Sequence, residues 1–458
     1  MVSIKVSIPD IISRSRQSTN DPIAKTNDRG KFVSLPAPAS VPLSRHLGGR
    51  IVAVNTDPTA QSSAQPRRWS AVAVTVLCGV VGAAYIAKLA PSLPDLRADL
   101  GIGMVTGGWI VSVLSIVGML SGMAAGMIGD RFGAARVLAA GLLLCAVGGT
   151  LGALSQTPWQ VLASRVVEGA GFILIVVPAA SVIAGAVHGP RRRLAFGIWG
   201  TYMPVGTALT FVAAPLILAD FGWRGVWAAI AAVTLLALIP VLRFLDVGKP
   251  AQTGGGLTLS ARLAAVVKVP GVWLAALIFT FYASQWVSLM IWLPTYLTEG
   301  RGLSIATASL MTAGIVVVNI PGNLLGGWLL RHGARHWQTI FAASVIMAVT
   351  SLGIFAVGTP LWLFYALCLT FSAFGGMAPA TILACGALFQ PDPAKMGAAN
   401  GLIVQGAHMG QVVGPPSLAA LVSYLGGWHW AGWLIASLAV GAMILALLLG
   451  IQERKAAT

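Results

Sequence analysis

The sequence predicts an all-α membrane protein whose twelve spanning helices form two six-helix bundles. Hydrophobic residues make up 57% of the chain and charged residues only 9%, whereas a soluble domain carries about 25% charged residues. Apolar runs of about 20 residues, the length that crosses a bilayer as a helix, recur along the chain and lack the alternation of barrel strands. The polar stretch from Asp246 to Pro270 divides these runs into two sets of six. We therefore expect a polytopic protein with helices as its spanning form.

Residues 1–66 precede the first apolar run and differ from the rest of the chain in composition. They are rich in Ser, Pro, Asn, Asp and Arg and have no sustained apolar period, so we expect a disordered cytoplasmic tail. The segment lacks the apolar centre of a secretory signal, and its four aspartates count against a transit peptide. The alternative interpretation is a start nearer residue 56.

Six apolar runs follow in residues 67–247, the predicted N-terminal bundle. Their helices are predicted at 70–91, 104–128, 135–155, 159–183, 194–218 and 223–245. A cytoplasmic linker at 248–269, with three consecutive glycines, leads to the C-terminal bundle at 270–451. Its helices are predicted at 271–297, 304–330, 337–357, 360–384, 398–424 and 429–450, before a cytoplasmic tail at 452–458. Loops this short join adjacent antiparallel helices.

The distribution of basic residues predicts the orientation of the chain. The net charge of +16 would suggest nucleic-acid binding in a soluble protein, but here the basic residues alternate by loop. With the N-terminus in the cytoplasm, the basic loop residues that fall outside are Arg97, Arg224 and Arg301, and the inner loops carry the excess. We therefore predict a multi-pass, monomeric protein of a bacterial inner membrane, with both termini cytoplasmic and no nucleic acid as partner.

The cysteines and the common catalytic motifs give no sign of a cofactor. The four cysteines each lie within an apolar run, without C-x-x-C pairing or a histidine at ligand spacing, so neither a disulfide nor a metal site is predicted. The chain contains no G-x-x-x-x-G-K-[ST], H-E-x-x-H, G-x-S-x-G or G-x-G-x-x-G motif. We predict no cofactor, no metal and no enzymatic activity.

A charged hairpin, Gly-Met-Ile-Gly-Asp-Arg-Phe-Gly-Ala-Ala-Arg at 126–136, lies between the second and third apolar runs. It resembles the major facilitator superfamily signature G-x-L-A-D-R-x-G-R-R-x, with alanines at its basic pair. The matching positions are Gly126, Asp130, Arg131, Gly133 and Arg136. The resemblance implies a gating motif in which the glycine allows close helix approach and the carboxylate lies near a helix N-terminus.

Two further features support the same resemblance, which covers residues from about 69 to 450. The fourth run contains Arg165, Gly169 and Gly171, similar to the superfamily's R-x-x-x-G-x-G element. The halves also repeat, as in duplicated transporters: Gly126, Arg131 and Gly133 recur 200 positions later as Gly326, Arg331 and Gly333 (326 − 126, 331 − 131, 333 − 133). Likewise the glycines at 197 and 206 match those at 401 and 410. The resemblance implies two six-helix bundles around a central cavity.

Lys88 is one of three charged residues inside apolar runs, where an unpaired charge costs a few kcal/mol. It follows Tyr85 by three residues, an arrangement similar to that of the superfamily's anion:cation symporters, which carry Arg there; cyanate-transporter-like members also have a basic residue near this place. The resemblance implies that Lys88 and Tyr85 bind an anionic substrate. The alternative is that Lys88, three residues before Pro91, extends to the outer interface.

Arg165 and Glu168 are the other two such residues, three positions apart on one predicted helix, so they can form an ion pair. In a functional interpretation Glu168 carries a proton and Arg165 adjusts its affinity. In a structural interpretation the two neutralise each other, while Gly169 and Gly171 pack a neighbouring helix. Both interpretations stay open.

Polar pairs at turn spacing lie on helices that line the central cavity in this superfamily. They are Trp199 and Tyr202, Tyr282 and Gln285, Asn319 and Asn323, and Gln405 and His408. We predict that Tyr202, Gln285, Asn319 and Gln405 contact the substrate, with interhelical hydrogen bonding as the alternative for each pair. His408 is a second candidate proton carrier, because imidazole titrates near neutral pH.

Together these features predict a secondary active transporter that moves a small organic or inorganic anion with a proton by alternating access. An exporter of amphipathic drugs or metabolites is the first alternative. The sequence at 203–206 matches the fifth-helix motif of drug-proton antiporters only in part, and the first helix has no embedded acid. A transporter-like sensor, which binds solute without moving it, is the second alternative.

Overall fold

The computed structural model describes residues 46–47, 50–51, 58–187, 190–245, 266–390 and 393–457. Within these ranges the side chains left undescribed are those of residues 46–68, 122–127, 130–131, 190, 192–193, 393–397 and 456–457. The chain divides into two compact units, Met1–Ser62 and Ser63–Thr458. In the first unit β1 (His46–Leu47) pairs antiparallel with β2 (Arg50–Ile51). The rest of the predicted tail before Pro58, and most of the predicted linker, lie outside the described residues.

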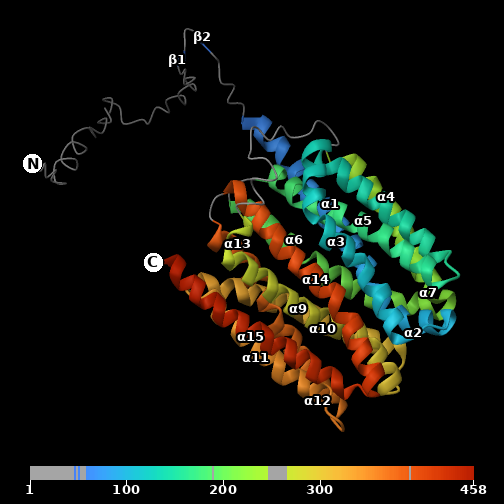
Figure 1. The fold of residues 1–458 in the computed structure, drawn as a ribbon. Helices are drawn as coiled ribbons and strands as arrows, with labels where there is room; N and C mark the ends of the chain where they lie inside the picture. Colours follow the sequence, from blue (N-terminus) through green and yellow to red (C-terminus); the bar gives the residue numbers. More distant parts are fainter. Residues whose placement is uncertain are drawn as a thin grey trace, which may run out of the picture. The chain divides into compact units, whose positions relative to one another are not determined.

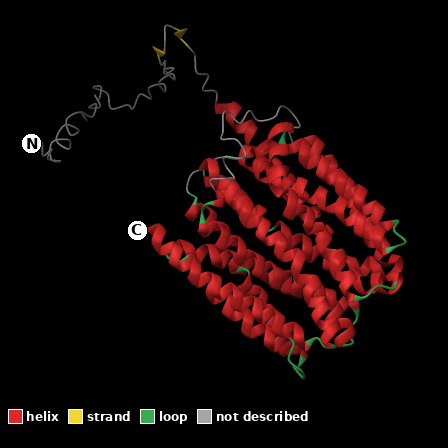
Figure 2. Cartoon of the chain, in the orientation of Figure 1, coloured by secondary structure: helices red, strands yellow, loops and turns green. Residues whose placement is uncertain are grey.

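The second unit is almost entirely helical (Figure 2). Its first half contains α1 (Pro58–Ala87, whose first residues up to Ser62 belong to the first unit), α2 (Leu89–Leu100), α3 (Met104–Phe132), α4 (Ala134–Ala153), α5 (Pro158–Ala186), α6 (Pro190–Trp199) and α7 (Tyr202–Phe244). Its second half contains α9 (Pro270–Thr295), the π-helical turn η2 (Tyr296–Gly300), α10 (Ile305–Arg331), α11 (His336–Ile354), α12 (Leu361–Gly375), α13 (Met377–Phe389), α14 (Pro393–Leu425) and α15 (His429–Ala457). Figure 1 shows the two halves packed side by side.

Ten helical segments in the described part of the chain are long and apolar enough to cross a membrane. The all-helical membrane class is therefore confirmed, whereas the predicted twelve spans are not all recovered. Two local features account for the difference. The 51-residue segment Leu194–Phe244 contains Gly222, whose φ of 59° and ψ of −170° separate two helices. The helix α14, which carries Pro415, Pro416 and several polar residues, is not among the ten.

The first predicted helix, 70–91, differs from the structure at its end. Regular helix stops at Ala87, and α2 continues the path to Leu100. Pro91 lies in the first turn of α2, where its missing N–H needs no partner within the helix. The proline therefore marks a new helix rather than the outer end of the first span.

Left-handed glycines recur at equivalent places in the two halves, which supports an internal repeat. Gly133, at the end of the predicted gating hairpin, has a φ of 92°, and Gly333 has a φ of 90°. Such values strain any residue with a β-carbon. Two more pairs share this conformation, at separations of 201 and 204 residues (302 − 101 and 426 − 222): Gly101 with Gly302, and Gly222 with Gly426.

Close helix contacts repeat in the same way. A β-carbon on Gly206 of α7 would overlap the carbonyl oxygen of Val80 on α1. One on Gly410 of α14 would overlap the carbonyl oxygen of Thr280 on α9. The carbonyl groups are 200 positions apart (280 − 80), and the glycines 204 (410 − 206). One buried apolar cluster includes Leu93 of α2 and other residues of both halves, and two smaller clusters lie within the first half.

Candidate functional site: a buried ion cluster

Lys88 lies at the junction of α1 and α2, where its backbone N–H donates to the Ala84 carbonyl oxygen at 2.9 Å. Its side chain is completely buried, and its Nζ lies 2.7 Å from Oε1 of Glu168 on α5. The alternative that Lys88 extends to the outer interface is therefore wrong. The helix continues beyond Lys88 as α2, and the ammonium finds a carboxylate inside the bundle instead of water.

Arg165 completes the ion cluster, which we define as Lys88, Arg165 and Glu168. Its Nη1 donates to the second carboxylate oxygen of Glu168, so the predicted pairing of these two residues is confirmed. All three side chains have no exposed surface. One carboxylate thus serves two cations, one oxygen each.

Backbone carbonyl groups hold the Arg165 guanidinium in place. Nη1 also donates to the carbonyl oxygen of Tyr85 on α1 at 2.7 Å, and Nε donates to that of Ile110 on α3 at 3.2 Å. The remaining nitrogen, Nη2, is buried and has no hydrogen-bond partner among the described residues. Arg165 therefore ties α1, α3 and α5 together, and both N–H groups of its Nη2 stay unused among the described residues.

Aromatic rings surround the Lys88 ammonium. Nζ lies 4.5 Å from the centre of the Tyr85 ring and 4.3 Å from that of the Trp227 ring on α7. Ring faces attract cations. The Tyr85 hydroxyl lies 2.8 Å from the Thr234 hydroxyl oxygen on α7, so it is engaged away from the lysine.

Glycines bring the neighbouring helices close to the cluster. A β-carbon on Gly148 of α4 would lie 2.7 Å from Cγ of Glu168. One on Gly169 would overlap the carbonyl oxygen of Leu114 on α3, and one on Gly171 would lie 2.6 Å from the Cys145 nitrogen on α4. The glycines of the fourth-helix element therefore pack neighbouring helices, as the structural interpretation expected.

The predicted substrate contacts of the second half form a separate polar group. Asn319 on α10 donates through Nδ2 to the Ser372 carbonyl oxygen on α12 at 3.0 Å and to the Tyr282 hydroxyl at 3.5 Å. Asn323 donates to Oδ1 of Asn319 at 2.9 Å. Gln285 donates to the Phe281 carbonyl oxygen at 3.0 Å, and its Oε1 has no partner within the described chain. The bonds of Asn319 to Ser372 and Tyr282 are interhelical, as the alternative for these pairs expected. Those of Asn323 and Gln285 stay within their own helices.

A seam of polar contacts joins α3 to α14, which belong to different halves. Gln405 Nε2 donates to the Met119 carbonyl oxygen at 3.3 Å. The Ser115 hydroxyl donates to Gln411 Oε1 at 2.8 Å. His408 is buried, and a β-carbon on Gly118 would lie 2.8 Å from its Cε1. We call these contacts the α3–α14 seam.

Tyr202, the remaining predicted substrate contact, stacks on Trp199 with ring centres 4.4 Å apart. Both rings lie against Gly79 of α1. In the predicted gating motif, the side chains of Asp130 and Arg131 are not described, and neither is the burial of Gly126. Arg136 is exposed at the start of α4. The predicted site residues thus do not form one site: they divide among the ion cluster, the polar group around Asn319, the α3–α14 seam and the Trp199–Tyr202 stack.

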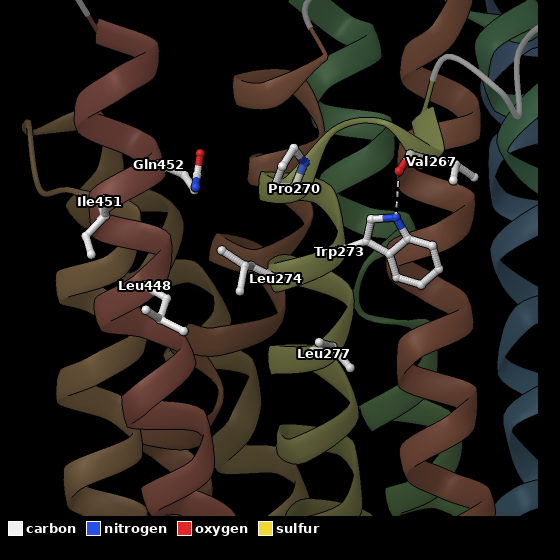
Figure 3. A pocket seen from close by; sticks show the side chains of 8 residues that line it. All are labelled: Val267, Pro270, Trp273, Leu274, Leu277, Leu448, Ile451 and Gln452. Atoms are coloured by element: carbon white, nitrogen blue, oxygen red, sulfur yellow. Dashed lines mark hydrogen bonds between the residues drawn. The ribbon is translucent and has the colours of Figure 1, made fainter.

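A groove of about 490 Å³ on the outside of the second half does not belong to any of these groups. Apolar side chains of α9 and α15 line it, with Gln452 at one end (Figure 3). Trp273 at its rim donates through Nε1 to the Val267 carbonyl oxygen at 3.0 Å. None of the predicted site residues lines this groove.

The fold and the ion cluster define a class: a multi-pass helical membrane protein with basic and acidic side chains buried inside its bundle. The family model of the Major Facilitator Superfamily matches residues 73–404 of this chain. The chain therefore belongs to that superfamily. This is a superfamily of transporters and not of enzymes. Like its relatives, the chain is a multi-pass membrane protein whose class binds small molecules within a lipid bilayer.

Three named relatives differ in what they do. The chain is 24% identical to the membrane sensor protein UhpC of Salmonella typhimurium, over 77% of this chain and 82% of UhpC. It is 27% identical to the probable nitrate/nitrite transporter NarK2 of Mycobacterium tuberculosis, over 54% of this chain and 63% of NarK2. It is 28% identical to the multidrug efflux pump LfrA of Mycolicibacterium smegmatis, over 45% of this chain and 41% of LfrA. The chain spans only 25% of an uncharacterized transporter of M. tuberculosis that it also matches.

Solved structures agree on the fold. A bacterial homolog of the human lysosomal transporter Spinster, in an inward-facing and unoccupied conformation, superposes with a TM-score of 0.76. The alignment covers 86% of this chain and 98% of that chain at 14% identity. This likeness supports the arrangement of helices and carries no information on substrate.

Several residues of the site gave no signal in the sequence. Trp227 is one of 15 tryptophans, and nothing in its surroundings distinguishes it as the partner of Lys88. Nothing in the sequence marks Thr234 as the partner of the Tyr85 hydroxyl either. Gln411 follows His408 by three residues and continues the turn-spaced polar pattern of α14. That spacing is the sequence signal that indicates Gln411.

Proposed function

We propose that this chain is a secondary active transporter that moves a small organic or inorganic anion together with a proton. The observation that carries the proposal is the ion cluster, in which Lys88 Nζ lies 2.7 Å from Glu168 while Arg165 holds the other carboxylate oxygen. With all three groups ionised, two cations and one carboxylate leave a net charge of +1 (2 − 1). A buried net charge is costly, and a monovalent anion beside Lys88 would remove it.

The same arithmetic links the anion to a proton. A group in the cluster that gains a proton makes the buried charge more positive, so protonation becomes easier when an anion is present. Each ligand therefore favours binding of the other, which is the thermodynamic requirement for coupling. Glu168 and His408 are the carriers predicted from the sequence. His408 supports that role by its burial and by a ring nitrogen, Nδ1, that has no partner among the described residues.

The α3–α14 seam supports alternating access. Gln405 and Gln411 bond across it, and Gly108 lies against Pro416, where a β-carbon would come within 2.9 Å of the proline Cα. Arg97 of α2 and Glu299 of η2 also pair at 2.9 Å across the halves. With the predicted orientation, this contact lies on the outer side. The Spinster homolog that this fold resembles was solved in an inward-facing conformation, which accords with closure on the outer side.

One of the three named relatives supports an anion as the substrate. NarK2 is a probable nitrate/nitrite transporter, and nitrate is a small monovalent anion of the kind that the cluster would neutralise. The efflux pump LfrA keeps the exporter alternative open, and UhpC keeps the sensor alternative open. Substrate charge and direction of movement distinguish these three functions.

The test begins with a thermal-shift screen of the purified protein against small anions and amphipathic drugs. A ligand that binds only the folded protein raises its melting temperature. The best ligand is then offered, radiolabelled, to proteoliposomes for counterflow. Anion counterflow supports the proposal, drug counterflow supports the exporter, and binding without counterflow supports the sensor. Liposomes without protein provide the baseline.

A further inference from the structure

The ion cluster contains one more group that can exchange a proton, and it is not one of the predicted carriers. Lys88 is wholly buried, its Nζ pairs with one carboxylate among the described residues, and it lies over the Tyr85 and Trp227 rings. Without an anion, the fully ionised cluster keeps its unbalanced positive charge. The loss of one proton from the cluster would bring the net charge to zero.

We infer that Lys88 is the proton-exchanging group of the transporter: its side chain is an uncharged amine when no anion is bound, and the proton that enters with the anion binds to its Nζ. This inference rests on the proposed function, because it identifies where the coupled proton resides.

The other groups that face Lys88 cannot take this role as easily. Arg165 does not lose its proton in proteins. Protonation of Glu168 would leave two buried cations without a counter-charge, and the carboxylate already accepts from both. The Tyr85 hydroxyl is bonded to Thr234, and the Cys145 thiol of α4 donates to the Glu168 carbonyl oxygen at 3.5 Å. From α7 the lysine faces the uncharged Trp227.

The charge balance of the proposed step closes for a monovalent anion. In the anion-free cluster, an uncharged Lys88, a positive Arg165 and a negative Glu168 sum to zero. The amine still donates an N–H bond to Glu168. When the anion enters, a proton delivered by water bonds to the nitrogen lone pair and leaves hydroxide behind, or arrives as hydronium and leaves water. The new ammonium and the anion again sum to zero, so one proton accompanies one anion.

The surroundings allow both forms of the side chain. Lys88 Nζ lies over the faces of the Tyr85 and Trp227 rings, which stabilise the ammonium. An N–H of the uncharged amine can also donate weakly to a ring face. A site that holds only one form would not exchange a proton. Arginine at position 88 would keep the cation in every state, which makes Lys88→Arg the discriminating variant.

The first experiment measures protonation without a substrate. If folded Lys88 is uncharged and the unfolded lysine is protonated, unfolding takes up a proton and the apparent Tm rises with pH. We expect the Tm of the wild-type protein to rise more between about pH 6 and 9 than the Tm of Lys88→Met. The difference in slope should correspond to the uptake of one proton on unfolding. Lys88→Gln provides the same comparison if Lys88→Met does not fold. Equal Tm slopes would show that Lys88 is always charged and would overturn the inference.

The second experiment measures coupling in proteoliposomes with the anion found by the thermal-shift screen. We expect Lys88→Arg to lose accumulation driven by an inward pH gradient, measured against the anion counterflow that the same variant retains. Retained accumulation in Lys88→Arg would overturn the inference and leave the proposed function intact. If the wild-type protein itself shows no gradient-driven uptake, the proposed function fails, while the Tm comparison still decides the charge of Lys88.

Discussion

At the residue scale, Glu168 holds the ion cluster together, because one of its carboxylate oxygens bonds to Lys88 and the other to Arg165. Removing one partner of a buried ion pair costs about 3 to 5 kcal/mol, since the other charge stays buried and unpaired. A carboxylate at the surface contributes much less, about 0 to 1 kcal/mol. Glu299, which is 44% exposed beside Arg97, is such a case.

These two glutamates make a matched pair of variants. We expect Glu168→Gln to lower the apparent Tm of the purified protein strongly and Glu299→Gln to leave it nearly unchanged. Equal effects of the two single substitutions would show that the cluster does not stabilise the bundle.

The sequence predicted one half of this cluster and missed the other for a physical reason. Arg165 and Glu168 are one helical turn apart, so spacing alone places them together. Lys88 is 80 positions away from Glu168, and only the packing of α1 against α5 brings them into contact. The nearby Pro91 suggested a helix end, yet proline is also common in the first turn of a helix, and that is its place in α2.

At the element scale, the α3–α14 seam depends on glycines that leave no room for side chains. Gly118 faces the His408 ring, so a larger residue would force the two helices apart. Gly327 on α10 offers the matched control, because a β-carbon there would meet no atom within 4 Å. Both glycines lie in helices, so the intrinsic helix cost of a substitution is similar.

We expect Gly118→Val to hold the seam open and Gly327→Val to leave it closed. The measurement is the reaction of a cysteine introduced at Ser112 with an impermeant thiol reagent added outside the cell. Ser112 is buried beside Gln411 in this structure, so the parent should react slowly. The four natural cysteines are buried as well. Equal rates in the two valine variants would contradict the role of the seam as an outer gate.

The hairpin between α3 and α4 is a second element with a testable role. Its backbone turns at Gly133, whose φ of 92° explains the glycine in the signature. We expect Asp130→Asn to lower the initial rate of transport while membrane insertion and abundance stay normal, because a gating carboxylate acts on the conformational change. Quantitative blotting provides the control for abundance. An unaltered rate at normal abundance would remove Asp130 from the mechanism.

The sequence predicted the elements well where length and hydropathy decide and less well where helices break. Most predicted boundaries lie within a few residues of those observed, as for 304–330 against Ile305–Arg331. The predicted helix at 360–384 is instead two helices, α12 and α13, which meet at Gly376. A β-carbon at Gly376 would overlap the Asn319 carbonyl oxygen, so the break follows from the approach of α10, which a single sequence does not reveal.

At the scale of the whole molecule, the predicted orientation follows from loop charges alone. We expect single cysteines at Gly189 and Gly254, in a cysteine-free background, to resist an impermeant thiol reagent in intact cells. A cysteine at Gly300, at the end of η2, should react. These expectations follow from the basic excess in the inner loops. Permeabilised cells, in which all three sites should react, are the control, and labelling at Gly254 from outside would reverse the orientation.

The central claim concerns the whole molecule as well: an anion and a proton move together through a superfamily fold with an ion cluster in its first half. The most direct measurement is uptake of the radiolabelled anion into proteoliposomes with an acidic exterior. A symporter accumulates the anion in either orientation, because the gradient acts on both. We predict accumulation above the equilibrium level that a protonophore abolishes. Uptake that stays at equilibrium with or without the pH gradient, or accumulation only under the opposite gradient, would contradict the account.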